Sequence, residues 1–173
     1  MEFAVPWASR FSGKKLSILP TGHCKATIGL SIYRSDEILS HMRTWFLVGG
    51  SILIAIAAIF HVYFFILESL TWRKPKTWKT FGLPSQEHAE IIRPMAFNQG
   101  FYNLFLAIGS ITGMAILGFN STIGYTLMIF ASSCMIGAGA VLFLSVKRSR
   151  KAAIIQAGPP LLGVLSLLIG LSR

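Results

Sequence analysis

The sequence has few charged residues. Of its 173 residues, 13% are Asp, Glu, Lys or Arg, whereas 53% are hydrophobic. Soluble globular domains carry about 25% charged residues, so this composition excludes an ordinary soluble domain. Several apolar runs also reach the roughly 20 residues that a helix needs to cross the hydrocarbon core of a bilayer. The composition therefore predicts an integral membrane protein.

Cysteine is scarce as well. Cys24 and Cys134 are the two cysteines of the chain, and they lie far apart in the sequence. This excludes a disulfide framework and a cysteine-based metal site. The sequence also contains no zinc-ligand spacing, nucleotide-binding loop, redox motif or pair of haem ligands. We therefore expect neither a metal nor a cofactor.

Acidic residues are outnumbered. Six Asp and Glu stand against sixteen Lys and Arg, which gives a formal net charge of +10. The basic residues cluster at the ends of apolar runs, notably in "RKPKTWK" and "KRSRK". This pattern is typical of the positive-inside rule and of contact with anionic lipid headgroups. It does not favour nucleic acid as a partner.

Four apolar segments are long enough to span a membrane. In lipid, a lone spanning segment satisfies its own backbone hydrogen bonds only as a helix. The chain is thus expected to be all-α, with a four-transmembrane-helix bundle in residues 42–173. The helices are predicted at about residues 44–70, 94–119, 121–146 and 152–171.

Small residues recur at a spacing of four in two of these segments, "GSITG" and "SLLIG". Such spacing lets helices approach closely, and we expect both to pack inside the bundle.

Residues 1–41 differ from the rest of the chain. They contain Pro, Gly and Ser and show no apolar periodicity, which predicts a weakly ordered N-terminal extension. Two alternatives stay open, namely that translation starts at Met42 or that the extension is a targeting segment.

The connections predict the topology. Loops 73–93 and 147–151 are both basic, and in a four-span protein they lie on the same side. The positive-inside rule predicts that this side is cytoplasmic and that both ends of the membrane domain lie outside. The expected location is the bacterial inner membrane.

Polar residues interrupt the apolar segments. His61 and Glu68 are two helical turns apart, so they share one helix face about 10 Å apart along the axis. Further polar side chains are expected at similar depth, and together they predict a cytoplasm-facing pocket formed by His61, Glu68, Asn98, Gln99, Tyr102, Asn103 and Gln156.

Other interpretations of these residues stay open. The amides and His61 can act as hydrogen-bonding links between helices. Glu68 can extend toward Arg73 or the headgroups instead of facing a pocket. Tyr63, Trp72 and Trp78 are expected to form an interfacial aromatic belt.

The runs "FHVYFFILESLTW", "AFNQGFYNLFLAIG" and "QAGPPLLGVLSLL" together resemble a family of small bacterial membrane proteins, domain of unknown function 1304. The resemblance covers about residues 43–171 and implies four helices. It also implies a family pattern at His61, Glu68, Asn98, Gln99, Gly100, Tyr102, Asn103, Gln156 and Pro159. It implies no particular reaction.

Three classes of function are compatible with the sequence. The first is binding or transport of a small amphipathic or lipid-like molecule, for which a homodimer could supply the path. The second is a membrane-embedded enzyme, isomerase-like or hydrolase-like, in which His61 and Glu68 act as acid and base. The third is a structural or assembly partner in a membrane complex. Membrane lipids are expected partners in each case.

Overall fold

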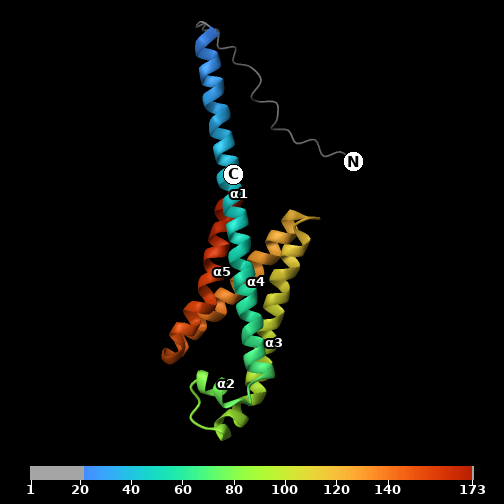
Figure 1. Ribbon diagram of the computed structural model, residues 1–173, viewed down its shortest axis with the longest axis vertical. Coiled ribbons are helices and arrows are strands. Elements are labelled where there is room, and N and C mark those ends of the chain that lie inside the picture. Colours follow the sequence, from blue (N-terminus) through green and yellow to red (C-terminus); the bar gives the residue numbers. More distant parts are fainter. Residues whose placement is uncertain (1–21, 173) are drawn as a thin grey trace, which may run out of the picture. The chain divides into compact units, whose positions relative to one another are not determined.

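The computed structural model describes residues 22–172, without the side chains of residues 22–33 and 35. Helices and the turns between them make up this part of the chain, and it contains no strand (Figure 1). The predicted all-α fold is therefore confirmed. The elements are α1 (Gly22–Phe65), a π-helical turn η1 (Ile66–Leu70), α2 (Pro75–Thr80), α3 (Gln86–Ile116), α4 (Ser121–Ser145), a 3-10 turn η2 (Lys147–Ser149) and α5 (Arg150–Leu171).

The chain divides into two compact units, Met1–Leu39 and Ser40–Arg173. A weakly ordered extension was expected over residues 1–41, and α1 begins at Gly22. No proline interrupts residues 22–43, so the backbone can stay helical there. Residues 1–21 of the predicted extension lie outside the described residues.

Within the second unit, α1 and α5 run antiparallel. Arg43 near the start of the unit donates from Nε to the carbonyl oxygen of Gly170 at 2.9 Å. Ser166 Oγ donates to the carbonyl oxygen of Phe46 at 2.8 Å. The serine of the "SLLIG" run thus packs inside the bundle, as predicted.

Helices α3 and α4 form an antiparallel hairpin. The side chain of Asn120 caps α4 by accepting a hydrogen bond from the backbone N–H of Ile123 at 3.0 Å. The two helices approach so closely that a Cβ added to Gly124 would lie 2.8 Å from the carbonyl oxygen of Gly113. The "GSITG" run therefore also packs inside the bundle.

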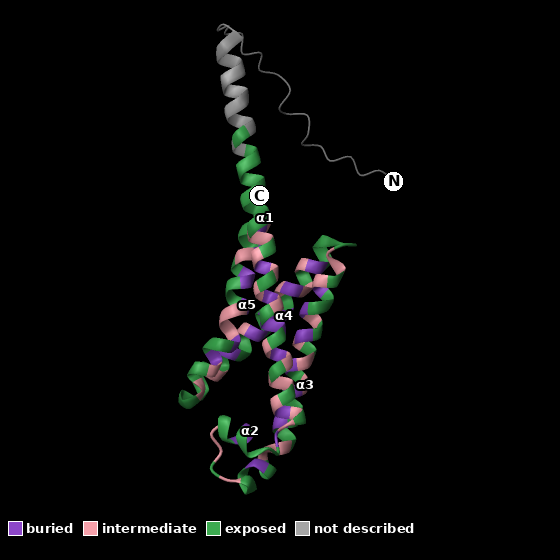
Figure 2. Cartoon of the chain, viewed as in Figure 1, coloured by how far each residue is buried: buried purple, intermediate pink, exposed green. Residues whose placement is uncertain are grey.

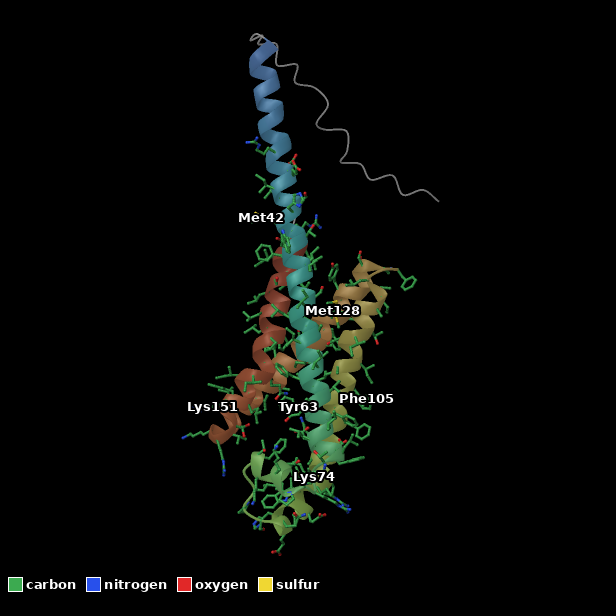
Figure 3. All side chains as sticks on the ribbon, in the orientation of Figure 1. Met42, Tyr63, Lys74, Phe105, Met128 and Lys151 are labelled. Carbon is green, nitrogen blue, oxygen red and sulfur yellow. The ribbon has the colours of Figure 1, made fainter. Side chains whose placement is uncertain are left out.

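The core lies where α1, α4 and α5 meet. Ile54, Met128 and Leu167 are fully buried and form one cluster. Buried residues lie on the helix faces that turn toward one another (Figure 2). Side chains such as Phe105 and Lys151 point away from the bundle (Figure 3).

Proline does not mark the start of α3. We expected the helix to begin at Pro94, but it begins at Gln86, and Pro94 lies inside it. Ser85 is the N-cap, because its side chain accepts a hydrogen bond from His88 N at 3.3 Å. Proline inside a helix removes one backbone hydrogen bond, and α5 tolerates two such residues, Pro159 and Pro160. Figure 1 shows a change of direction along α5.

Three helical segments among the described residues are long and apolar enough to cross a membrane. They are Asp36–Leu70, Ser121–Ser145 and Lys147–Leu171. They indicate a multi-pass membrane protein. Helix α3 has 31 residues, but its amide side chains lower its mean hydropathy, and it is not among the three. It nevertheless packs along α4 as a member of the bundle.

The two basic loops lie at the same end of the second unit. Arg148 Nη1 donates to the carbonyl oxygen of Gly82 at 3.1 Å. Gly82 has a φ of 78°, a conformation that glycine adopts without strain. This contact joins the connection before α3 to the connection before α5.

Candidate functional site

The strongest interhelical polar contact of the predicted site joins Glu68 to Asn103. Asn103 Nδ2 donates to Glu68 Oε2 at 2.8 Å, between the π turn η1 and helix α3. Both residues are buried, with exposed fractions of 9% for Glu68 and 4% for Asn103. The side-chain amide of Asn103 thus gives Glu68 a specific hydrogen-bond partner inside the bundle.

A glycine allows this contact. A Cβ added to Gly100 would collide with Ser69 Oγ and lie 3.1 Å from Glu68 Cβ. The close approach also lets Ser69 Oγ donate to the carbonyl oxygen of Phe97 at 2.9 Å. Gly100, which the family resemblance singled out, thus positions η1 against α3.

His61 faces the bundle interior. Its side chain is fully buried, and Nδ1 donates to the carbonyl oxygen of Ala57 at 2.9 Å. The other ring nitrogen, Nε2, has no hydrogen-bond partner among the described residues. The same holds for two buried hydroxyls, Ser110 Oγ on α3 and Ser132 Oγ on α4.

Gln156 of α5 is buried as well. Ile54 of α1 packs against Gly163, which lies two helical turns further along α5, beyond Pro159 and Pro160. The buried polar residues of the predicted site are thus the hydrogen-bonded pair Glu68 and Asn103 and, apart from it, His61 and Gln156.

The other three predicted residues lie on the outer face of α3. Asn98, Gln99 and Tyr102 are exposed in the bundle, and Asn98 Nδ2 donates to Tyr102 Oη at a long distance of 3.4 Å. At 100° per residue, Gly100 and Asn103 share the inward face, whereas these three residues project elsewhere. The structure therefore does not bring all seven predicted residues into one cavity.

A groove of about 590 Å³ lies between η1 and the first half of α3. Ligand pockets typically have volumes of about 300–1,000 Å³ and apolar walls with few polar groups. Glu68 lines this groove together with Ser69, Leu70, Trp72, Arg73, Arg93, Pro94 and Phe97. Of the seven residues predicted from the sequence, Glu68 alone lines it.

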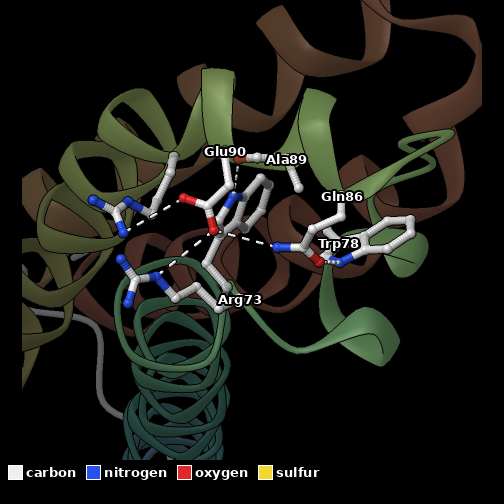
Figure 4. Close-up of polar contacts among 7 residues, drawn as sticks. Arg73, Trp78, Gln86, Ala89 and Glu90 are labelled. Carbon is white, nitrogen blue, oxygen red and sulfur yellow. Dashed lines mark hydrogen bonds and ion pairs between the residues drawn. The ribbon is translucent and has the colours of Figure 1, made fainter.

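Trp72 and Trp78 do not lie where we expected them. We expected Trp72 and Trp78 in an interfacial belt, but both are buried. Trp72 Nε1 donates to the carbonyl oxygen of Ala89 at 2.8 Å, and Trp78 Nε1 donates to Gln86 Oε1 at 2.7 Å. These bonds fix the loop and α2 against α3 (Figure 4). Tyr63 is exposed, as a belt residue would be.

The structure offers no evident metal ligands in the part of the chain that it describes. No group of three or more His, Cys, Asp or Glu side chains comes together there. His88, which neighbours two glutamates in the sequence, has its Nδ1 2.8 Å from Ser85 Oγ.

A family model described as "Protein of unknown function (DUF1304)" matches residues 55–168. The match includes η1, α3, α4 and most of α5, and hence all of the groove. Neither a curated protein nor a solved structure matches the chain.

Proposed function

We propose a function for this chain, which belongs to the DUF1304 family of proteins of unknown function, from the chemistry of its groove. The chain binds a small amphipathic or lipid-like molecule between η1 and α3. The observation that carries this proposal is a groove of about 590 Å³ that combines apolar walls with a buried, hydrogen-bonded carboxylate.

The lining supports an amphipathic ligand in particular. Leu70 and Phe97 provide apolar surface, and both are well exposed in the bundle. Arg73 and Arg93 provide cationic groups, and their side chains are 71% and 41% exposed. A molecule with one apolar and one polar end matches this division of the lining.

The enzyme alternative finds less support. His61 and Glu68 would have to act on one substrate as acid and base. His61, however, is fully buried at a different level of the bundle and does not line the groove. Binding therefore accounts for more of the geometry than acid–base chemistry does.

The test is to fill the groove from its exposed side. Leu70→Trp places a larger side chain in the lining, and Leu162→Trp makes the same change at an exposed residue of α5 outside the groove. The protein is reconstituted in phosphatidylcholine nanodiscs. Native mass spectrometry then measures binding of three amphipaths with the same tail, namely dodecyl phosphate, dodecyl maltoside and dodecyltrimethylammonium.

We expect at least one amphipath to bind at a single saturable site. Leu70→Trp should weaken that binding about tenfold, because the side chain occupies the ligand's volume, and Leu162→Trp should leave it unchanged. Absence of saturable binding of all three amphipaths, or an equal effect of both variants, would contradict the proposal.

A further inference from the structure

Two arginines of the groove converge on one carboxylate. Arg73, which follows η1, has its Nε 3.7 Å from Glu90 Oε1. Arg93 of α3 has its Nη1 3.5 Å from Glu90 Oε2. Figure 4 shows the Arg73 side chain directed at Glu90, and Arg93 pairs with the same carboxylate from another element. The fold therefore builds a position for one negative charge between two cations.

The two ion pairs of Glu90 are weak. Charge-assisted N–H···O bonds are about 2.7–2.9 Å long, and both ion pairs exceed this. The Glu90 side chain is 44% exposed, and ion pairs at such exposure contribute little to stability. Gln86 Nε2 also donates to Glu90 Oε1, at 3.2 Å, so the carboxylate has a partner without the arginines. Another anion can therefore replace Glu90 at the arginines with little loss of stability.

The same arginines line the groove, whereas Glu90 does not. Glu68 is the acidic residue of the lining, but it is only 9% exposed and accepts a hydrogen bond from Asn103. An anion that approaches through the groove therefore meets the more exposed guanidinium groups next to the apolar surface of Leu70 and Phe97. The planar guanidinium group suits phosphate and carboxylate because it can donate two parallel hydrogen bonds.

We propose that the groove selects amphipaths with an anionic phosphate or carboxylate head group, and that Glu90 competes with this head group for Arg73 and Arg93. This inference rests on the proposed function, because it names the ligand class of the same groove. Neutralising an arginine weakens binding, and neutralising Glu90 strengthens it.

The experiment uses the nanodisc assay and charge-matched variants of the full chain. Arg73→Gln and Arg93→Gln each remove one cation of the groove. Lys76→Gln is their control, because Lys76 is an exposed cation of the neighbouring helix α2 outside the groove. Glu90→Gln removes the competing carboxylate, and Glu87→Gln removes an exposed carboxylate of the same helix. Thermal unfolding verifies that every variant is folded.

We expect dodecyl phosphate to bind about tenfold more tightly than dodecyl maltoside. Each arginine variant should weaken dodecyl phosphate binding about three- to tenfold, and Glu90→Gln should strengthen it about threefold. Lys76→Gln and Glu87→Gln should leave it nearly unchanged. Inorganic phosphate at the same concentration should not compete, because it lacks the tail that contacts the apolar wall.

Four results would overturn the inference. Equal binding of the phosphate and maltoside amphipaths, still lost in Leu70→Trp, would remove the anionic preference and leave the proposed function standing. Competition by inorganic phosphate would indicate a site for free anions. Equal effects of Arg73→Gln and Lys76→Gln would indicate general surface charge. Absence of all binding would overturn the inference together with the proposed function.

Discussion

Asn103 is the hydrogen-bond donor of the buried carboxylate Glu68. Replacement by leucine keeps similar volume but leaves the carboxylate without that partner. We predict that Asn103→Leu lowers the free energy of unfolding by about 1–3 kcal/mol, the usual effect of an unsatisfied buried polar group. Denaturant unfolding in detergent micelles measures this.

Asn98 provides the matched control for this prediction. It is an exposed amide of the same helix with one long hydrogen bond. Asn98→Leu should change the free energy of unfolding by less than about 0.5 kcal/mol. If the two substitutions destabilise the protein equally, the Glu68–Asn103 contact does not form in solution.

His61 differs from Asn103, because it has no hydrogen bond to another helix among the described residues. Its buried Nε2 has no partner among the described residues, so loss of the imidazole removes no interhelical hydrogen bond. We predict that His61→Leu changes the free energy of unfolding by less than about 1.5 kcal/mol, because the volume is nearly kept. His61→Ala should cost about 2–4 kcal/mol, because it leaves a cavity. Similar losses in both variants would show that the imidazole itself makes a stabilising interaction.

Sequence reasoning predicted the inward direction of some of the polar residues but not of others. His61, Glu68 and Asn103 were expected to face inward, and all three are buried. Asn98 and Gln99 were expected beside them but project outward. The reason is that Asn98, Gln99, Tyr102 and Asn103 lie within two helical turns of α3, so they share a depth range whatever their direction. An apolar helix gives no strong contrast between its two faces, so the inward side could not be deduced.

At the element scale, close helix contacts depend on single glycines of α4. A Cβ at Gly124 would lie 2.8 Å from a backbone oxygen of α3, whereas a Cβ at Gly137 would meet nothing within 4 Å. We predict that Gly124→Ala lowers the free energy of unfolding by about 1–3 kcal/mol through overpacking. Gly137→Ala should raise it by about 0.5–1 kcal/mol, because alanine favours the helix interior. Thermal unfolding of both variants tests the pair, and a stabilising effect at both positions would contradict the observed approach.

The start of a helix could be predicted where the sequence contains one local start signal. Helix α4 was expected at 121–146 and is Ser121–Ser145, because Asn120 provides a clear cap. Helix α3 was expected at 94–119 and is Gln86–Ile116, because Ser85 caps it and Pro94 lies inside it. The first helix was expected from residue 44, whereas α1 begins at Gly22.

At the scale of the whole molecule, the Arg148–Gly82 contact puts both basic loops at one end of the bundle. We predict that this end is cytoplasmic, because positively charged loops are retained on that side. The experiment is cysteine labelling in intact cells after replacement of Cys24 and Cys134 by serine. Lys76→Cys and Lys147→Cys should react only after the membrane is made permeable, and Asn120→Cys should react from outside. Outward labelling at Lys76→Cys would reverse the orientation.

The π turn Ile66–Leu70 also bears on how relatives of this chain can be compared. The backbone N–H of Thr71, which follows the turn, donates to the carbonyl oxygen of Ile66, one residue further back than in an α-helix. Such a turn is equivalent to an α-helix that has gained one residue. A relative with one residue fewer between the positions of His61 and Trp72 would keep both anchors but lose the bulge that directs Glu68 toward Asn103. The number of residues between the positions of His61 and Trp72 should therefore indicate which relatives have the carboxylate site. The presence of a glutamate in that interval is a weaker indication.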